Sequence, residues 1–113
     1  MADTIVFGLD GANWGVTDRW LDDGLLPNIQ RLRDNGVDAV SKSEHPPVTC
    51  PNWKCYSTAK NPGGFGVFWW ENIDFTDETI SFPDGRSFRS TDIWDYFADA
   101  NRSWAALNMP NTY

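Results

Sequence analysis

The residues of this sequence best suited to chemistry lie in the segment Thr49-Cys50-Pro51-Asn52. Pro51 favours the first turn of a helix, because its fixed φ suits that turn and its missing N–H would have no partner there. The sequence predicts a helix over residues 51–58 with Thr49 just outside its N-terminus. Backbone donors and the positive end of the helix dipole favour an anion there. The Thr49 hydroxyl would therefore face a bound phosphate, although a Thr before a helix is often only a cap.

A second candidate, Asp10, follows the apolar run of residues 4–9. Continuous apolar residues with β-branched members predict a buried parallel strand. Open α/β sheets bind their ligands at the carboxyl ends of such strands, so Asp10 is a candidate ligand-binding carboxylate. The alternative is that Asp10 only forms a turn with Gly11.

The remaining patterns predict a mostly parallel sheet flanked by helices, an α/β fold with a small β-hairpin insertion. The strands over residues 5–9 and 104–107 are expected to be neighbours, or near neighbours, in that sheet. The other predicted elements are a short helix within residues 13–21, a helix from Pro27 to Asn35-Gly36, a strand over 37–43, the helix 51–58 stopped by residues 61–64, a β-hairpin within 73–88 that turns at 83–85, and a helix capped by residues 90–92.

The predicted fold is incomplete, because the chain stops after a strand and its loop, where an α/β domain normally adds a covering helix. We therefore expect residues 1–113 to be one domain, the N-terminal part of a larger α/β domain.

The composition disfavours two classes of partner. The chain of 113 residues has a net charge of −7, which disfavours nucleic acids and anionic membranes as partners. No signal peptide or membrane-spanning run is found, so a cytoplasmic location is expected. Cys50 and Cys55 form no Cys-x-x-Cys pair and are expected to be reduced thiols. The single histidine, His45, is more typical of a loop than of a metal site.

Taken in order, these segments resemble the N-terminal part of the alkaline phosphatase superfamily, closest to the type I phosphodiesterase/nucleotide pyrophosphatase group. The resemblance covers nearly the whole chain and implies an alkaline phosphatase-like sheet. The matching residues are Ile5-Val6-Phe7-Gly8-Leu9-Asp10-Gly11, Leu26-Pro27-Asn28-Ile29-Gln30-Arg31-Leu32 with Gly36, Pro46-Pro47-Val48-Thr49-Cys50-Pro51-Asn52-Trp53, Thr58-Ala59-Lys60-Asn61-Pro62, and Trp94 with Asn108-Met109-Pro110-Asn111-Thr112-Tyr113.

The resemblance implies a metal-dependent hydrolase of small-molecule phosphoric esters. It assigns Asp10 to a divalent metal, usually zinc, Thr49 to the nucleophile and the same metal, and Asn52 to the phosphoryl oxygens. Metal coordination would activate the weakly nucleophilic Thr hydroxyl, and two metals would hold the attacking and leaving oxygens in line. Ligand oxygens of Asp10 and Thr49 that share a zinc ion should lie within about 4 Å of each other.

Departures from the family pattern leave the enzymatic status open. The further Asp and His ligands of the two-metal site come from later in the family's chain, and His45 does not replace them. Phe65 stands where the family often has His, and Ala59 where Gly is usual. We therefore expect almost no activity from residues 1–113 alone. The alternative function is an inactive fragment that serves as an interaction or structural module.

Two other enzyme classes fit less well. A sulfatase would place a modifiable Cys or Ser at the position of Thr49 and an Arg further along, where this chain has Lys54. A cysteine phosphatase requires Arg six residues after its Cys, and Tyr56 and Asn61 occupy those positions here. The spacing excludes the cysteine phosphatases.

Overall fold

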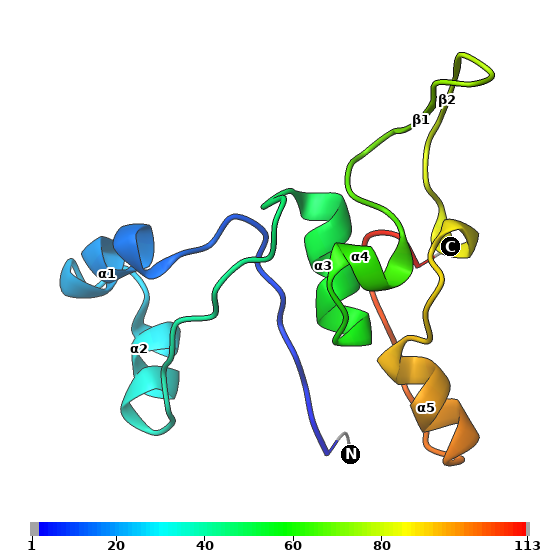
Figure 1. The fold of residues 1–113 in the computed structure, drawn as a ribbon. Coiled ribbons are helices and arrows are strands. Elements are labelled where there is room, and N and C mark those ends of the chain that lie inside the picture. Colours follow the sequence, from blue (N-terminus) through cyan, green and yellow to red (C-terminus); the bar gives the residue numbers. More distant parts are fainter. Residues whose placement is uncertain (1–2, 113) are drawn as a thin grey trace. The chain divides into compact units, whose positions relative to one another are not determined.

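The computed structural model describes residues 3–112. The chain divides into two compact units, Met1–Ser41 and Lys42–Tyr113. Helices predominate in both units, and the described residues contain one two-stranded sheet (Figure 1). This mixture of helices and a small sheet is compatible with an incomplete α/β fold. No helix in the described part of the chain is long and apolar enough to cross a membrane.

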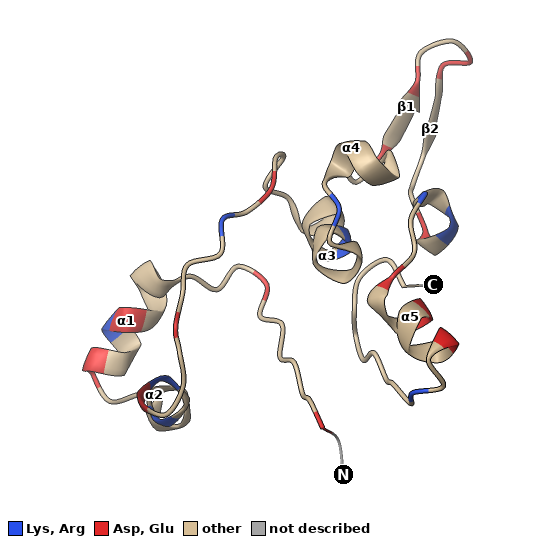
Figure 2. Ribbon diagram, turned by 60° about the horizontal axis from the view of Figure 1, so that its bottom comes forward, with Lys and Arg blue, Asp and Glu red and all other residues tan. Residues whose placement is uncertain are grey.

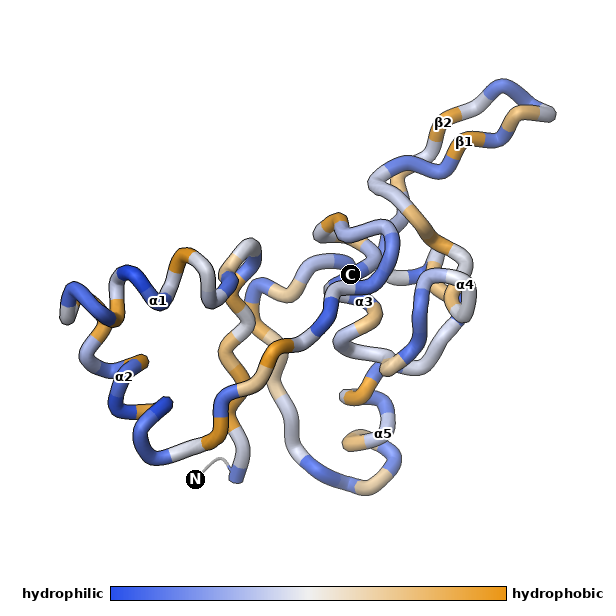
Figure 3. The backbone as a smooth tube through the Cα atoms, turned by 60° about the vertical axis from the view of Figure 1, so that its left-hand side comes forward, coloured by the Kyte–Doolittle hydropathy of each residue, from blue (hydrophilic) through white to orange (hydrophobic). Residues whose placement is uncertain are grey.

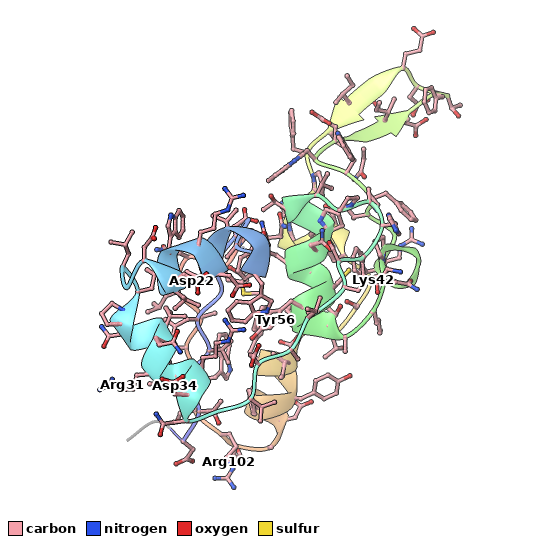
Figure 4. All side chains as sticks on the ribbon, turned by 90° about the vertical axis from the view of Figure 1, so that its left-hand side faces the viewer. Asp22, Arg31, Asp34, Lys42, Tyr56 and Arg102 are labelled. Carbon is pink, nitrogen blue, oxygen red and sulfur yellow. The ribbon has the colours of Figure 1, made fainter. Side chains whose placement is uncertain are left out.

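The first unit holds two helices, α1 (Trp14–Asp22) and α2 (Pro27–Asp34), which contact each other. The Asn13 side chain caps α1 by accepting a hydrogen bond from the Val16 N–H at 3.2 Å. Pro27 occupies the first turn of α2, and the helix ends at Asp34 with Asn35 as its C-cap. Both helix predictions are confirmed. Charged side chains of these helices are exposed, among them Asp22, Arg31 and Asp34 (Figure 4).

The second unit is built around a small core. Buried side chains of Cys50, Phe65, Val67 and Phe88 form it, with Cys55 packed against them. The Phe65 and Phe88 rings meet edge to face with centroids 5.5 Å apart. The elements of this unit are α3 (Thr49–Thr58), α4 (Pro62–Phe65), β1 (Asn72–Asp74), β2 (Thr79–Ser81), the 3-10 helix η1 (Gly85–Ser87) and α5 (Ile93–Asp99).

The predicted start of α3 was wrong by two residues, whereas its predicted end at Thr58 is confirmed. The helix begins at Thr49 with Val48 as its N-cap, so Thr49 is its first residue rather than the residue outside it. It ends at Thr58, because Ala59 adopts a left-handed conformation with φ of 54°. The segment expected to stop the helix instead begins α4, which is capped by the Asn61 side chain. Pro51 still lies in the first turn, as predicted.

The β-hairpin prediction is confirmed, but its turn was wrongly placed. β1 and β2 pair antiparallel with Ile73 opposite Ile80. The chain reverses between them, where the Asp74 carboxylate accepts hydrogen bonds from the N–H groups of Thr76 and Asp77 at 2.8 and 3.3 Å. Asp84 lies beyond the end of β2 at Ser81, and its side chain caps η1 instead. The prediction of a capped helix after residue 90 is also confirmed, with Asp92 as the N-cap of α5.

The predicted parallel sheet is not formed in the part of the chain that the structure describes. Residues 4–9, 37–43 and 104–107 lie in neither a helix nor a strand. These segments carry exposed apolar side chains, and the backbone coloured by hydropathy shows hydrophobic stretches outside the helices (Figure 3). A parallel strand needs partners for its backbone and cover for both faces, and no strand among residues 3–112 pairs with these segments. The parallel sheet therefore stays a prediction.

Candidate functional site

Thr49 lies at the first position of α3, the ten-residue helix of the second unit. Val48 before it has an extended backbone with φ of −119°, and its carbonyl accepts the Asn52 N–H at 3.2 Å. The Thr49 hydroxyl is therefore carried at the positive end of the helix dipole, where negative charge is favoured. A phosphoryl group beside Thr49 would meet a favourable electrostatic field.

Asn52 joins the start of α3 to the preceding loop. Its Oδ1 accepts hydrogen bonds from the Ser43 Oγ and from the Glu44 N–H, both at 3.2 Å. Its Nδ2 donates to the Val48 carbonyl at 3.0 Å. A side-chain amide has two N–H donors, so the second one is the group that could reach a phosphoryl oxygen. In this structure Asn52 organises the loop that leads to Thr49.

Asp10 lies in the first unit, within a tight turn. The Ala12 N–H donates to the Leu9 carbonyl at 3.3 Å, and Gly11 has φ of 71°. Asp10 and Gly11 thus lie in a turn, the arrangement considered as the alternative for Asp10, and its role as a metal ligand stays a prediction. Because Asp10 and Thr49 belong to different units, their predicted approach within about 4 Å stays a prediction.

The donor atoms of Asp10 and Thr49 suit a zinc ion, which binds carboxylate oxygens and polarises hydroxyl groups. Among residues 3–112, no group of three or more His, Cys, Asp and Glu side chains is gathered in a way that could hold a metal. The two candidate ligands would therefore need ligands from elsewhere to complete the coordination of a metal.

The two thiols of α3 are poor candidates for a nucleophile. Burial raises the pKa of the Cys50 thiol, against a smaller opposing effect of the Asn111 side chain. Burial, together with the negative charge of Glu44, raises the pKa of the Cys55 thiol. The two cysteines form no disulfide with each other, and a raised pKa keeps a thiol protonated at neutral pH. The hydroxyl of Thr49 is thus the better candidate.

Residues 4–113 match the family model described as type I phosphodiesterase / nucleotide pyrophosphatase. The chain belongs to this family. The resemblance predicted from the sequence is confirmed, and with it a phosphoester hydrolase-like family with small-molecule phosphoester substrates. No curated protein and no solved structure matches the chain.

Sequence reasoning missed one polar cluster in this type I phosphodiesterase family member. Lys54 of α3 is buried and forms an ion pair with Asp92, with 2.7 Å between Nζ and Oδ2. Figure 2 shows a basic stretch on α3 in blue and acidic stretches on α5 in red. The sequence pattern that could have revealed this cluster is the spacing of Cys50, Lys54 and Ser57. In a helix this spacing places a Lys and a Ser on the same face as Cys50.

Proposed function

We propose that this type I phosphodiesterase family member is a metal-dependent hydrolase of phosphoric esters with Thr49 as its nucleophile. Asn52 would hold the phosphoryl oxygens, and Asp10 and Thr49 would bind the divalent metal, most simply zinc. The observation that carries the proposal is the position of Thr49 at the first residue of α3, within a chain whose residues 4–113 match the family. At that position the helix dipole favours the charge of the bound phosphoryl group.

The proposed reaction has two steps. The Thr49 Oγ1 attacks phosphorus, the bond from phosphorus to the leaving oxygen breaks, and the hydroxyl proton passes to the departing oxygen or to water. Water then attacks the phosphothreonine ester, the bond between phosphorus and Oγ1 breaks, and Thr49 regains its proton. When bound, the metal would lower the pKa of the hydroxyl and offset the negative charge that develops on the oxygens.

Asn52 and the helix start would orient the phosphoryl group. The side chain of Asn52 already bonds to the loop at Ser43 and Glu44, which holds its amide beside the first turn of α3. A donor held in place before the reaction contributes more than one that must first be ordered. Loss of this amide should therefore lower the rate of the chemical step.

The second candidate function is a non-catalytic interaction module, and the exposure of apolar side chains favours it. Phe7 is 84% exposed, Val37 98% and Leu107 88%, each in a segment without helix or strand. Zinc content measured by inductively coupled plasma spectrometry separates the two candidates. In a form of the protein that is active, two zinc ions per chain support the hydrolase, and none supports the module.

The direct assay is hydrolysis of a nitrophenyl phosphodiester and monoester with added zinc or manganese, by this chain and by any longer product of the same gene. In the active form, Thr49→Ala should lower the turnover rate by several orders of magnitude. It should cost at most about 1 kcal/mol of stability, because only a contribution at the helix terminus is lost. Thr49→Ser keeps the hydroxyl and should keep part of the activity. Zinc-dependent turnover that survives Thr49→Ala would show that the site is wrong.

A further inference from the structure

The buried face of α3 is unusually polar. Cys50, Lys54 and Ser57 follow one another at helical spacing and are 1%, 2% and 3% exposed. The buried stripe of a helix is normally apolar, because burying a polar or charged group costs free energy unless it is paired. The Lys54 and Ser57 side chains therefore need partners across this face.

Asp92 is the partner of both side chains. The Lys54 Nζ donates to Asp92 Oδ2 at 2.7 Å, and the Ser57 Oγ donates to Asp92 Oδ1 at 2.6 Å. Asp92 is also the N-cap of α5, where its own N–H donates to the Asp95 carboxylate at 2.9 Å. The Lys54 ammonium lies 4.7 Å from the centre of the Phe88 ring, a favourable cation–π distance. One carboxylate thus connects two turns of α3 to the start of α5.

Asn111 makes a third contact, at the start of α3. Its Nδ2 donates to the Cys50 carbonyl at 3.1 Å, one residue after Thr49. The contact joins residues that are 61 positions apart in the chain. The left-handed backbone of Asn111, with φ of 61°, suits Asn better than most residues. The helix is therefore held near Thr49 as well as one and two turns further along.

For the orientation of α3, the direction of the hydrogen bonds to Asp92 matters more than their contribution to stability. A buried ion pair is often no more stabilising than apolar packing of the same volume, because desolvation offsets the attraction. The hydrogen bonds that Lys54 and Ser57 donate to Asp92 have fixed directions, however. They restrict rotation and sliding of α3 in a way that apolar contacts do not. Lys54 lies about 7.5 Å along the axis from Thr49, at 1.5 Å per residue. A rotation of the helix would move the Thr49 hydroxyl.

We propose that Lys54, Asp92 and Asn111 are positioning residues for Thr49. They fix the rotation and the axial position of α3, and so the direction in which its first residue presents the hydroxyl. None of them contacts substrate in this proposal. The catalytic part of the inference rests on the proposed role of Thr49 as the nucleophile, whereas the positioning itself is measurable without any activity.

The test compares Lys54→Met and Asn111→Ala with a matched control, Val67→Ala. Lys54→Met keeps an unbranched stem without the ammonium and leaves the Asp92 cap of α5 in place. Asn111 is only partly buried, so Asn111→Ala should fold. Val67 is 1% exposed in the same core, and its truncation lowers stability without removing a polar contact of α3. The spectroscopic measurements are the NMR shift of the Thr49 methyl group and the hydrogen exchange of the Cys50 and Asn52 amides.

Both positioning variants should shift the NMR signal of the Thr49 methyl group and speed amide hydrogen exchange at the start of α3. Val67→Ala should do neither, even where it lowers the melting temperature by the same amount. In an active form, kcat should fall about 100-fold, with KM within about twofold, because a small displacement of a nucleophile is costly. An unmoved Thr49 signal in both variants, or an equal shift in Val67→Ala, overturns the positioning role. Turnover that persists in Thr49→Ala overturns the proposed function instead, and the NMR result still decides the positioning.

Discussion

Helix α3 and the apolar segment of residues 4–9 differ in where their backbone hydrogen bonds come from. The helix satisfies its backbone within itself and buries Cys50, Pro51, Lys54 and Ser57. The segment forms no strand, and its apolar side chains are largely exposed. A parallel strand receives hydrogen bonds only from neighbouring strands, and parallel neighbours are distant in sequence. The helix that carries Thr49 thus depends less on distant residues than does the segment that leads to Asp10.

The largest predicted contrast is between two phenylalanines, Phe65 in the core that includes Cys50 of α3 and Phe7 in the segment of residues 4–9. Phe65 is fully buried beside Phe88, so Phe65→Ala should lower the free energy of unfolding by about 3–5 kcal/mol. Phe7 is 84% exposed, so Phe7→Ala should change it by no more than about 0.5 kcal/mol. Urea unfolding followed by tryptophan fluorescence measures both. A cost above about 2 kcal/mol for Phe7→Ala would mean that this segment is packed, as the predicted parallel sheet requires.

The same contrast explains which features could be predicted from the sequence. Pro27, Pro51 and Asp92 act within one turn of their own helices, so helix starts were predicted to within two residues. The hairpin turn was misplaced because Asp74 and Asp84 both carry turn signals, and only their hydrogen bonds distinguish them. The Asp92 cluster was missed because it joins residues 38 positions apart. Contacts over such distances leave little trace in a single sequence.

A smaller effect is predicted where α3 ends. Ala59 has φ of 54°, a conformation that costs an L-residue about 1–2 kcal/mol and glycine nothing. Glycine also gains entropy in the unfolded chain, which offsets part of that difference. Ala59→Gly should therefore raise the free energy of unfolding by roughly 0.5–1 kcal/mol in urea titrations. Ala98→Gly, inside α5, is the opposite control and should lower it by about 1 kcal/mol. A loss of stability in Ala59→Gly would show that α3 does not end in this way.

The smallest predicted effect concerns the hairpin. Hydrogen bonds from the N–H groups of Thr76 and Asp77 lower the pKa of the Asp74 carboxyl. The stabilisation is present above the ordinary Asp pKa, about 3.9, and is lost as the pH falls through the lower folded value. NMR signals of the Thr76 and Asp77 amides should therefore move below about pH 4. Asp74→Ala should remove this transition and Asp77→Asn should keep it. A transition that persists in Asp74→Ala would assign it to another group.

The most direct test of Thr49 as the nucleophile is mass spectrometry of an active form of the protein, after a rapid acid quench during turnover of a nitrophenyl phosphodiester with zinc. The account predicts a phosphoryl adduct on the peptide that contains Thr49. The adduct should be absent in Thr49→Ala and present at a lower level in Asn111→Ala, whose Cys50 contact is lost. Zinc-dependent turnover without an adduct on Thr49, or with an adduct on another residue, would contradict the central claim.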